Sequence, residues 1–120
     1  MRRIVITGLL IVWGVWGAAV PATGQRRPVP VFVGGRDGYQ TYRIPAIVSM
    51  KDGTLLAFAE GRVGGMADFG HIDIVMKVSR DHGASWGPLQ VVADNGALQA
   101  GNPAPVVDLS DPRYPRGRGF

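Results

Sequence analysis

The chain has 120 residues and no cysteine, which excludes disulfide cross-links and thiolate metal sites. Its formal charge of +4 suggests a polyanionic partner, but seven of the thirteen basic residues lie near the two ends, at Arg2, Arg3, Arg26, Arg27, Arg113, Arg116 and Arg118. Between Pro28 and Pro112 there are six basic and nine acidic residues, a net charge of −3, so we reject nucleic-acid binding, which needs a basic face.

The first 24 residues have the pattern of a secretory signal peptide. Two arginines precede an uncharged stretch from Ile4 to Val20, and Ala22–Gly24 offers small residues for cleavage. A membrane anchor is the alternative, but this stretch of 17 residues is shorter than the roughly 20 apolar residues that a spanning helix needs. We therefore predict a signal peptide over residues 1–24, a secreted or periplasmic protein, and no membrane association after cleavage.

The remaining chain is predicted to be all-β. Residues 25–34 form an extended lead-in segment, because each proline disfavours helix at the residue before it. Tyr42–Met50 and Thr54–Glu60 are apolar runs separated by the turn residues Lys51–Gly53, which predicts a hairpin. Pro45 must then lie at a strand start or on an edge strand, since it cannot donate to a ladder.

Two more strands are expected after a glycine-rich loop at Arg62–Gly70. Residues Ile72–Ser79 alternate, which puts Ile74, Met76 and Val78 on one face of a half-buried strand. Leu89–Val92 can pair back on that strand as a fourth. Four short antiparallel strands make one blade of a β-propeller.

The C-terminal part has a different composition. Residues 94–120 are rich in Asn, Pro, Gly, Asp and Arg, and only Ala104–Leu109 could form a strand there. A single blade leaves its faces uncovered, and repeat units of this kind need about three copies for independent stability. We expect residues 35–120 to be the N-terminal part of a truncated propeller, the first blade and the start of the second, which does not fold stably alone.

The segment SRDHGASW follows the third predicted strand. It matches the aspartate box, S-x-D-x-G-x-[ST]-W, at all defined positions: Ser79, Asp81, Gly83, Ser85 and Trp86. An Asp side chain can accept hydrogen bonds from backbone N–H groups of its own turn, and Gly permits positive φ. The box resembles those of sialidases and of other propellers. The resemblance implies a structural role for Asp81, on the face away from the active site.

Tyr42–Pro45, YRIP, resembles the sialidase motif [FY]-R-I-P at the start of the first of six blades. In that family this Arg holds the carboxylate of sialic acid, a task suited to a guanidinium fork. The resemblance thus implies substrate binding by Arg43. An edge-strand Arg, exposed because of its neighbouring Pro, is the alternative.

The spacing after Arg43 extends the resemblance. Arg62 follows by 19 residues and Asp68 by 25, matching a second substrate-contacting Arg and the acid/base Asp of sialidases. A carboxyl group on a loop can protonate a leaving-group oxygen, and burial would raise its pKa toward that role. A solvated loop Asp is the alternative. Asp73 ranks second as the catalytic carboxylate, and neither His71 nor His82 is a strong candidate.

Gly101–Asp108 also resembles a sialidase stretch, in which Asn102 would reach the sugar; an ordinary turn Asn before Pro is the alternative. Together the resemblances imply a retaining exo-sialidase that removes terminal sialic acid from glycans. In that family the nucleophile is a tyrosine, and the positions of Tyr39, Tyr42 and Tyr114 do not match it. We expect this chain to be inactive alone. No cofactor or metal site is expected. The alternative functions are a non-catalytic propeller that binds sugars or proteins, and a structural protein in which Arg43 is incidental.

Overall fold

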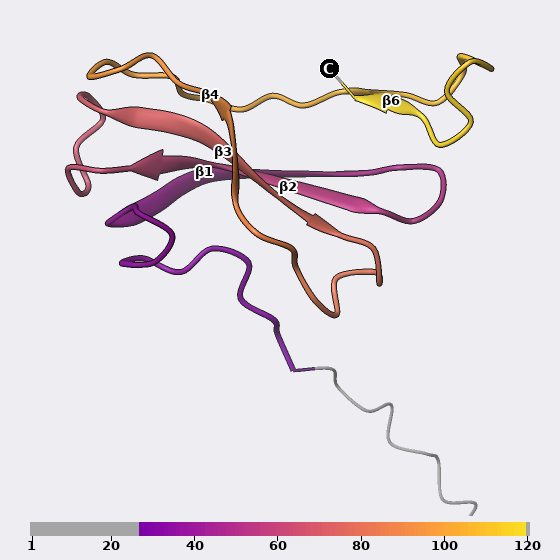
Figure 1. Ribbon diagram of the computed structural model, residues 1–120, viewed down its shortest axis with the longest axis horizontal. Helices are drawn as coiled ribbons and strands as arrows, with labels where there is room; N and C mark the ends of the chain where they lie inside the picture. The colour runs from indigo at the N-terminus through magenta and orange to yellow at the C-terminus, as the bar shows by residue number, and fades with distance from the viewer. Residues whose placement is uncertain (1–26, 120) are drawn as a thin grey trace, which may run out of the picture.

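The computed structural model describes residues 27–119 and contains six strands in that range (Figure 1). They are β1 (Thr41–Ser49), β2 (Leu55–Arg62), β3 (Ile72–Ser79), β4 (Gln90–Ala93), β5 (Val107–Asp108) and β6 (Arg118–Gly119). No helix capable of crossing a membrane is found among these residues. The predicted signal peptide lies outside the described residues.

Strands β1 to β4 form one antiparallel sheet in chain order, a four-stranded meander. The all-β prediction is confirmed, and so are the hairpin and the third and fourth strands, each within two residues of its predicted bounds. Patterns among neighbouring residues are enough to predict these strands. Alternation defines each strand, and the turn at residues 51–53 closes the hairpin, where Gly53 has a φ of 82° and its N–H donates to Met50 O at 3.0 Å.

Strand β1 lies at the edge of this sheet, as the proline within it requires. The ladder to β2 is regular up to the pair Arg43–Glu60, then shifts before Ala46–Phe58. Ile44 lies in this irregularity with a φ of 49°, a conformation that a β-branched residue rarely adopts. Such a bulge bends the strand and turns the side chains beside it. Arg43 is the residue immediately before it.

The small core lies on one face of the sheet. It contains Tyr39, Ala59 and Val75, with Phe32, Tyr42 and Leu89 packed against it. The Tyr39 ring covers Gly61, where a Cβ atom would lie 2.8 Å from ring carbon Cδ1. The prediction of a half-buried third strand is therefore confirmed: Val75, on the core face, is fully buried, whereas Ile74, Met76 and Val78, on the other face, are only partly buried.

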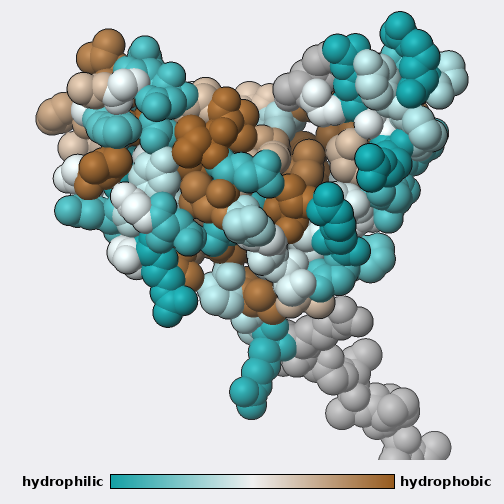
Figure 2. Space-filling view, in the orientation of Figure 1, coloured by the Kyte–Doolittle hydropathy of each residue, from teal (hydrophilic) through white to brown (hydrophobic). Residues whose placement is uncertain are grey.

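The other face of the sheet is apolar and open. Residues of all four strands, together with residues 103–106 and Gly119, line a hollow of about 440 Å³: Val48, Leu56, Phe58, Ile74, Met76 and Val92. Figure 2 shows apolar residues gathered near the centre of the molecule. This face is apolar and is only partly covered, by residues 103–106 and Gly119.

The expectation of a single strand after residue 94 is wrong, because β5 pairs with β6. The chain reverses between them through two hydrogen-bonded turns, in which Tyr114 N–H donates to Asp111 O and Gly117 N–H donates to Tyr114 O. Gly117, with a φ of 95°, permits the second reversal. A pairing of two residues is too short for periodicity to reveal.

The turn after β3 has the hydrogen bonds expected of SRDHGASW. Asp81 Oδ1 accepts from Ser85 N–H and from the Ser79 hydroxyl, both at 2.8 Å, and Ser79 Oγ accepts from Gly83 N–H at 2.8 Å. The Ser85 side-chain and backbone donors, followed by the Ser79 hydroxyl, lower the Asp81 pKa to about 2. Because β3 separates this turn from Arg62, the two regions lie at opposite ends of the sheet, about 23 Å apart at a strand rise of roughly 3.3 Å per residue.

Candidate functional site

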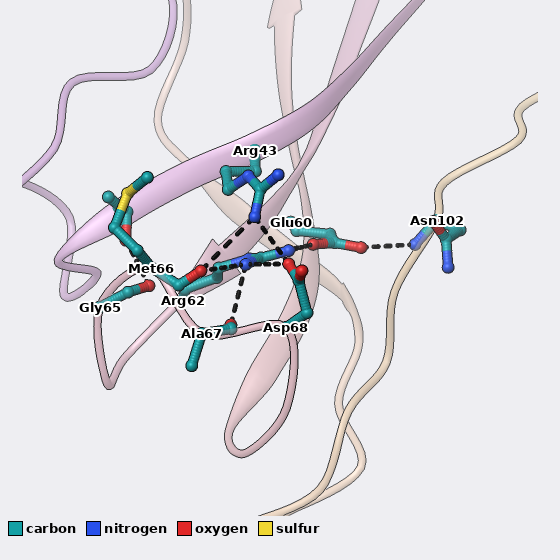
Figure 3. A network of polar contacts seen from close by, with 9 residues as sticks. Arg43, Glu60, Arg62, Gly65, Met66, Ala67, Asp68 and Asn102 are labelled. Atoms are coloured by element: carbon teal, nitrogen blue, oxygen red, sulfur yellow. Dashed lines mark hydrogen bonds and ion pairs between the residues drawn. The ribbon is translucent and has the colours of Figure 1, made fainter.

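One end of the sheet brings three predicted site residues together (Figure 3). Arg43 comes from β1, Arg62 ends β2, and Asp68 lies in the loop that joins β2 to β3. Antiparallel pairing explains the arrangement, because Arg43 pairs with Glu60 and lies next to the end of β2. The same pairing sets the start of β3 beside Arg62, so the loop returns over both arginines.

Both arginines donate to the same carboxylate oxygen. Arg43 Nη1 lies 2.6 Å from Asp68 Oδ1, and Arg62 Nη1 lies 2.7 Å from it. The three side chains differ in accessibility: 73% of Asp68 and 38% of Arg43 is exposed, but only 3% of Arg62. Arg43 therefore faces solvent at this end of the sheet, whereas Arg62 supports the arrangement from beneath.

Arg62 is held by the loop and by Glu60. Its Nη1 donates to the carbonyl oxygens of Met66 and Ala67, both at 2.8 Å, while its Nε and Nη2 donate to Glu60 Oε2. The hydrogen bonds from Arg62 to Glu60 are the largest cause of a raised Arg62 pKa. The guanidinium thus stays charged, and it fixes the loop that carries Asp68.

Glu60 is a site residue that the sequence analysis missed. Its side chain is 1% exposed, and its second oxygen, Oε1, accepts the backbone N–H of Asn102 at 2.9 Å. Glu60 and Arg62 are two residues apart in a strand, so their side chains leave the same face of the sheet. That spacing was the signal available in the sequence.

The expectation that burial raises the pKa of Asp68 is wrong for this conformation. The carboxylate is exposed, and hydrogen bonding from Arg62, followed by the charge of Arg43, lowers its pKa. Asp68 is therefore ionised here. It acts as an anion held by two arginines, and protonation requires that this contact be weakened.

The other residues considered from the sequence differ in their distance from this group. Asn102 reaches it through its backbone N–H on Glu60, in a left-handed conformation with a φ of 55°. Asp73 is buried within β3, where its Oδ2 accepts from the Tyr39 hydroxyl at 2.7 Å. His71 is not isolated, since its Nε2 lies 3.4 Å from Asp73 Oδ2. His82 lies in the turn at the far end of the sheet.

One group of side chains could hold a metal ion, although none was expected from the sequence. Within the described range, ligand atoms of His71, Asp73 and Asp94 lie within 4.8 Å of one another. Asp94 follows β4, and the pairing Ile74–Ala93 brings it next to the start of β3. Sequence reasoning missed this cluster because Asp94 follows β4 and lies beside Asp73 only through the pairing of β3 with β4.

A hollow of about 210 Å³ adjoins Arg43 and is lined by Phe32, Tyr42, Pro45 and Ala59. An exposed guanidinium beside an apolar and aromatic surface is suited to a ligand that has both a carboxylate and a carbon skeleton. The fold and this site define an antiparallel β protein in which two arginines hold a loop carboxylate at one end of the sheet.

Comparison with known proteins identifies the family. The chain is 47% identical over 83 residues to an exo-alpha-sialidase of Aspergillus fumigatus, 38% over 104 residues to a sialidase of Micromonospora viridifaciens, and 37% over 87 residues to an exo-alpha-sialidase of Arthroderma benhamiae. These matches cover 64%, 82% and 68% of the chain. No protein-family model matches it. The matched segment belongs to the sialidase family.

The matches cover only a small part of each relative. The chain spans 20% of the Aspergillus protein, 15% of the Micromonospora protein and 21% of the Arthroderma protein. The family relationship therefore concerns this segment.

Proposed function

We propose that this chain supplies the carboxylate-binding end of a glycoside hydrolase that removes terminal sialic acid from glycans outside the cell. One observation carries the proposal: Arg43 and Arg62 already hold a carboxylate, that of Asp68, at 2.6 and 2.7 Å. Sialic acid has a carboxylate on its anomeric carbon, so it presents the same group at the atom where the glycosidic bond is cleaved.

The substrate carboxylate replaces Asp68 on Arg43. Arg43 is the accessible arginine, and an exposed ion pair of this kind contributes little to stability, so exchange of one carboxylate for another costs little. Arg62 keeps Glu60 and two loop carbonyls and therefore holds the loop during the exchange. Its direct contact with substrate is limited by its burial, and its main role is to position Asp68.

Release from Arg43 prepares Asp68 for acid catalysis. Losing one cation raises the carboxyl pKa from its lowered value, and a bound sugar that excludes water raises it further. Asp68 then donates its proton to the leaving-group oxygen and later accepts one from water, as a retaining mechanism requires. The anionic substrate thus shifts the Asp68 pKa toward the protonated state that cleavage needs, while the Arg62 hydrogen bond, the largest cause of the lowered pKa, opposes that shift until it loosens.

The remaining parts of the proposal follow the family resemblance. The sheet β1–β4 is one blade of a six-bladed propeller, Asn102 contacts the sugar, and the nucleophile is a tyrosine. No tyrosine of this chain matches that nucleophile, so the 120 residues alone are expected not to hydrolyse a sialoside. A non-catalytic sugar-binding propeller is disfavoured, because binding alone does not need a carboxylate on a loop over two arginines.

The test uses the full-length product, which is the complete polypeptide that the gene encodes. Asp68→Ala should lower kcat by roughly 10²-fold or more on a sialoside with a sugar leaving group, and much less on a nitrophenyl sialoside, whose leaving group departs without protonation. Arg43→Ala should chiefly raise KM for both substrates. Arg36→Ala is the control and should change neither constant, because Arg36 is exposed and its hydrogen bonds within residues 27–119 are made by its backbone. If Asp68→Ala lowers kcat equally for both substrates, Asp68 is not the general acid.

A further inference from the structure

Two carboxylates of the described residues are buried, and only one of them is paired with an arginine. Glu60 has Arg62 as its partner and both of its oxygens accept hydrogen bonds. Asp73, with a side chain 6% exposed, has no Lys or Arg partner among the ion pairs of residues 27–119. Its Oδ2 accepts from the Tyr39 hydroxyl, but its Oδ1 is buried without a hydrogen-bond partner. Buried carboxylates are normally paired with a cation or bound to a metal.

Two exposed side chains complete a set of donors around Asp73. His71 Nε2 lies 3.4 Å from Asp73 Oδ2, and a carboxylate oxygen of Asp94 completes a group whose ligand atoms lie within 4.8 Å of one another. Ligands about 2.0–2.1 Å from a tetrahedral zinc ion are roughly 3.4 Å apart. His71 and Asp94 are exposed, so their side chains have room to rotate toward that spacing.

We infer that His71, Asp73 and Asp94 form a divalent metal site, with zinc as the ion it favours. An imidazole and two carboxylates are ligands that Zn²⁺ and Mn²⁺ share, and Zn²⁺ binds such sets more tightly. The two carboxylates carry two negative charges, which a divalent cation neutralises. Among the described residues the buried Oδ1 of Asp73 has no hydrogen-bond partner, so this carboxylate still lacks a neutralising contact.

The surroundings of Asp73 are already ordered for this purpose. The Tyr39 hydroxyl fixes the carboxylate from the core side, as hydrogen bonds to metal-ligating carboxylates commonly do. Gly61, which pairs with Asp73, leaves the space that the Tyr39 ring occupies. A bound ion would tie the end of the Asp68 loop, at His71, to the segment after β4. This site is separate from the Arg43 and Asp68 contact and does not depend on the proposed activity.

Zinc titration of the full-length product, made without a histidine tag and stripped with a chelator, tests the inference. Calorimetry should show that the wild type binds zinc saturably at one site. The affinity of that site for zinc should fall roughly tenfold or more in both His71→Ala and Asp94→Asn, a loss of the size seen when groups at a metal site are removed. Both positions are exposed, so these variants are expected to fold.

Asp52→Asn is the matched control. Like Asp94, Asp52 is exposed and its Oδ1 accepts the backbone N–H two residues on, a bond that the Asn oxygen preserves. Its zinc binding should equal that of the wild type. X-ray absorption of the zinc-loaded protein should also show one imidazole ligand that His71→Ala removes. The inference is overturned if zinc affinity is unchanged in His71→Ala and Asp94→Asn, or if Asp52→Asn lowers zinc affinity by the same factor.

Discussion

Replacing Glu60 by Gln tests how the site is held together. Glu60 accepts three hydrogen bonds, two from Arg62 and one from the backbone N–H of Asn102. A Gln side chain has one acceptor oxygen, so at least one buried donor loses its partner, and the buried Arg62 loses its enclosed counter-charge. Removing one partner of a buried ion pair costs about 3–5 kcal/mol.

The expected loss lies at the lower end of that range, about 3 kcal/mol, because Arg62 keeps two carbonyls and Asp68 as acceptors. Urea unfolding of the full-length product measures the free energy of unfolding for Glu60→Gln and for Asp68→Asn. Asp68→Asn removes a partner of the same guanidinium, but an exposed one, and should change stability little. A Glu60→Gln loss below about 1 kcal/mol, or an equal loss in Asp68→Asn, would refute the reasoning.

Two further predictions concern the fold. Gly61→Ala should destabilise the full-length product by about 1–3 kcal/mol, because the new Cβ meets the Tyr39 ring at 2.8 Å. Gly64→Ala is the control and should not destabilise it, because the space around Gly64 is open. Equal melting temperatures for the two variants would contradict this prediction. Asp81 has a folded pKa of about 2 against an ordinary 3.8, so it stabilises the fold above pH 4 and less as pH falls toward 2. The stability difference between wild type and Asp81→Asn should therefore shrink between pH 5 and pH 2, and a constant difference would count against this carboxylate.

The parts of the fold that follow from neighbouring residues were predictable from the sequence. Alternation and turn residues gave the four strands of the sheet, and the box turn followed from the spacing of its Ser and Asp residues. The more deeply buried face of β3 was not predictable in this way. Which face is buried depends on Tyr39, 36 residues before Val75, and packing at that separation leaves no periodic signal.

The candidate site was predictable where a motif covers it. Arg43, Arg62 and Asp68 do come together, as their spacing indicated. The ionised state of Asp68 was not expected, because it depends on two arginines that the strand pairing aligns rather than on the burial of the loop. The neighbourhood of His71, Asp73 and Asp94 likewise arises from the register of β3 and β4, which local sequence does not define.

The central claim is that Arg43 binds the carboxylate of sialic acid. Dissociation constants of free sialic acid and of its carboxamide, measured for the full-length product and for Arg43→Ala, test it most directly. A hydrogen bond to a charged group contributes about 1.5–3 kcal/mol, so the wild type should prefer the carboxylate by roughly tenfold or more. Arg43→Ala should lose most of that preference. If the variant discriminates between the two ligands as strongly as the wild type does, Arg43 is not the carboxylate-binding residue.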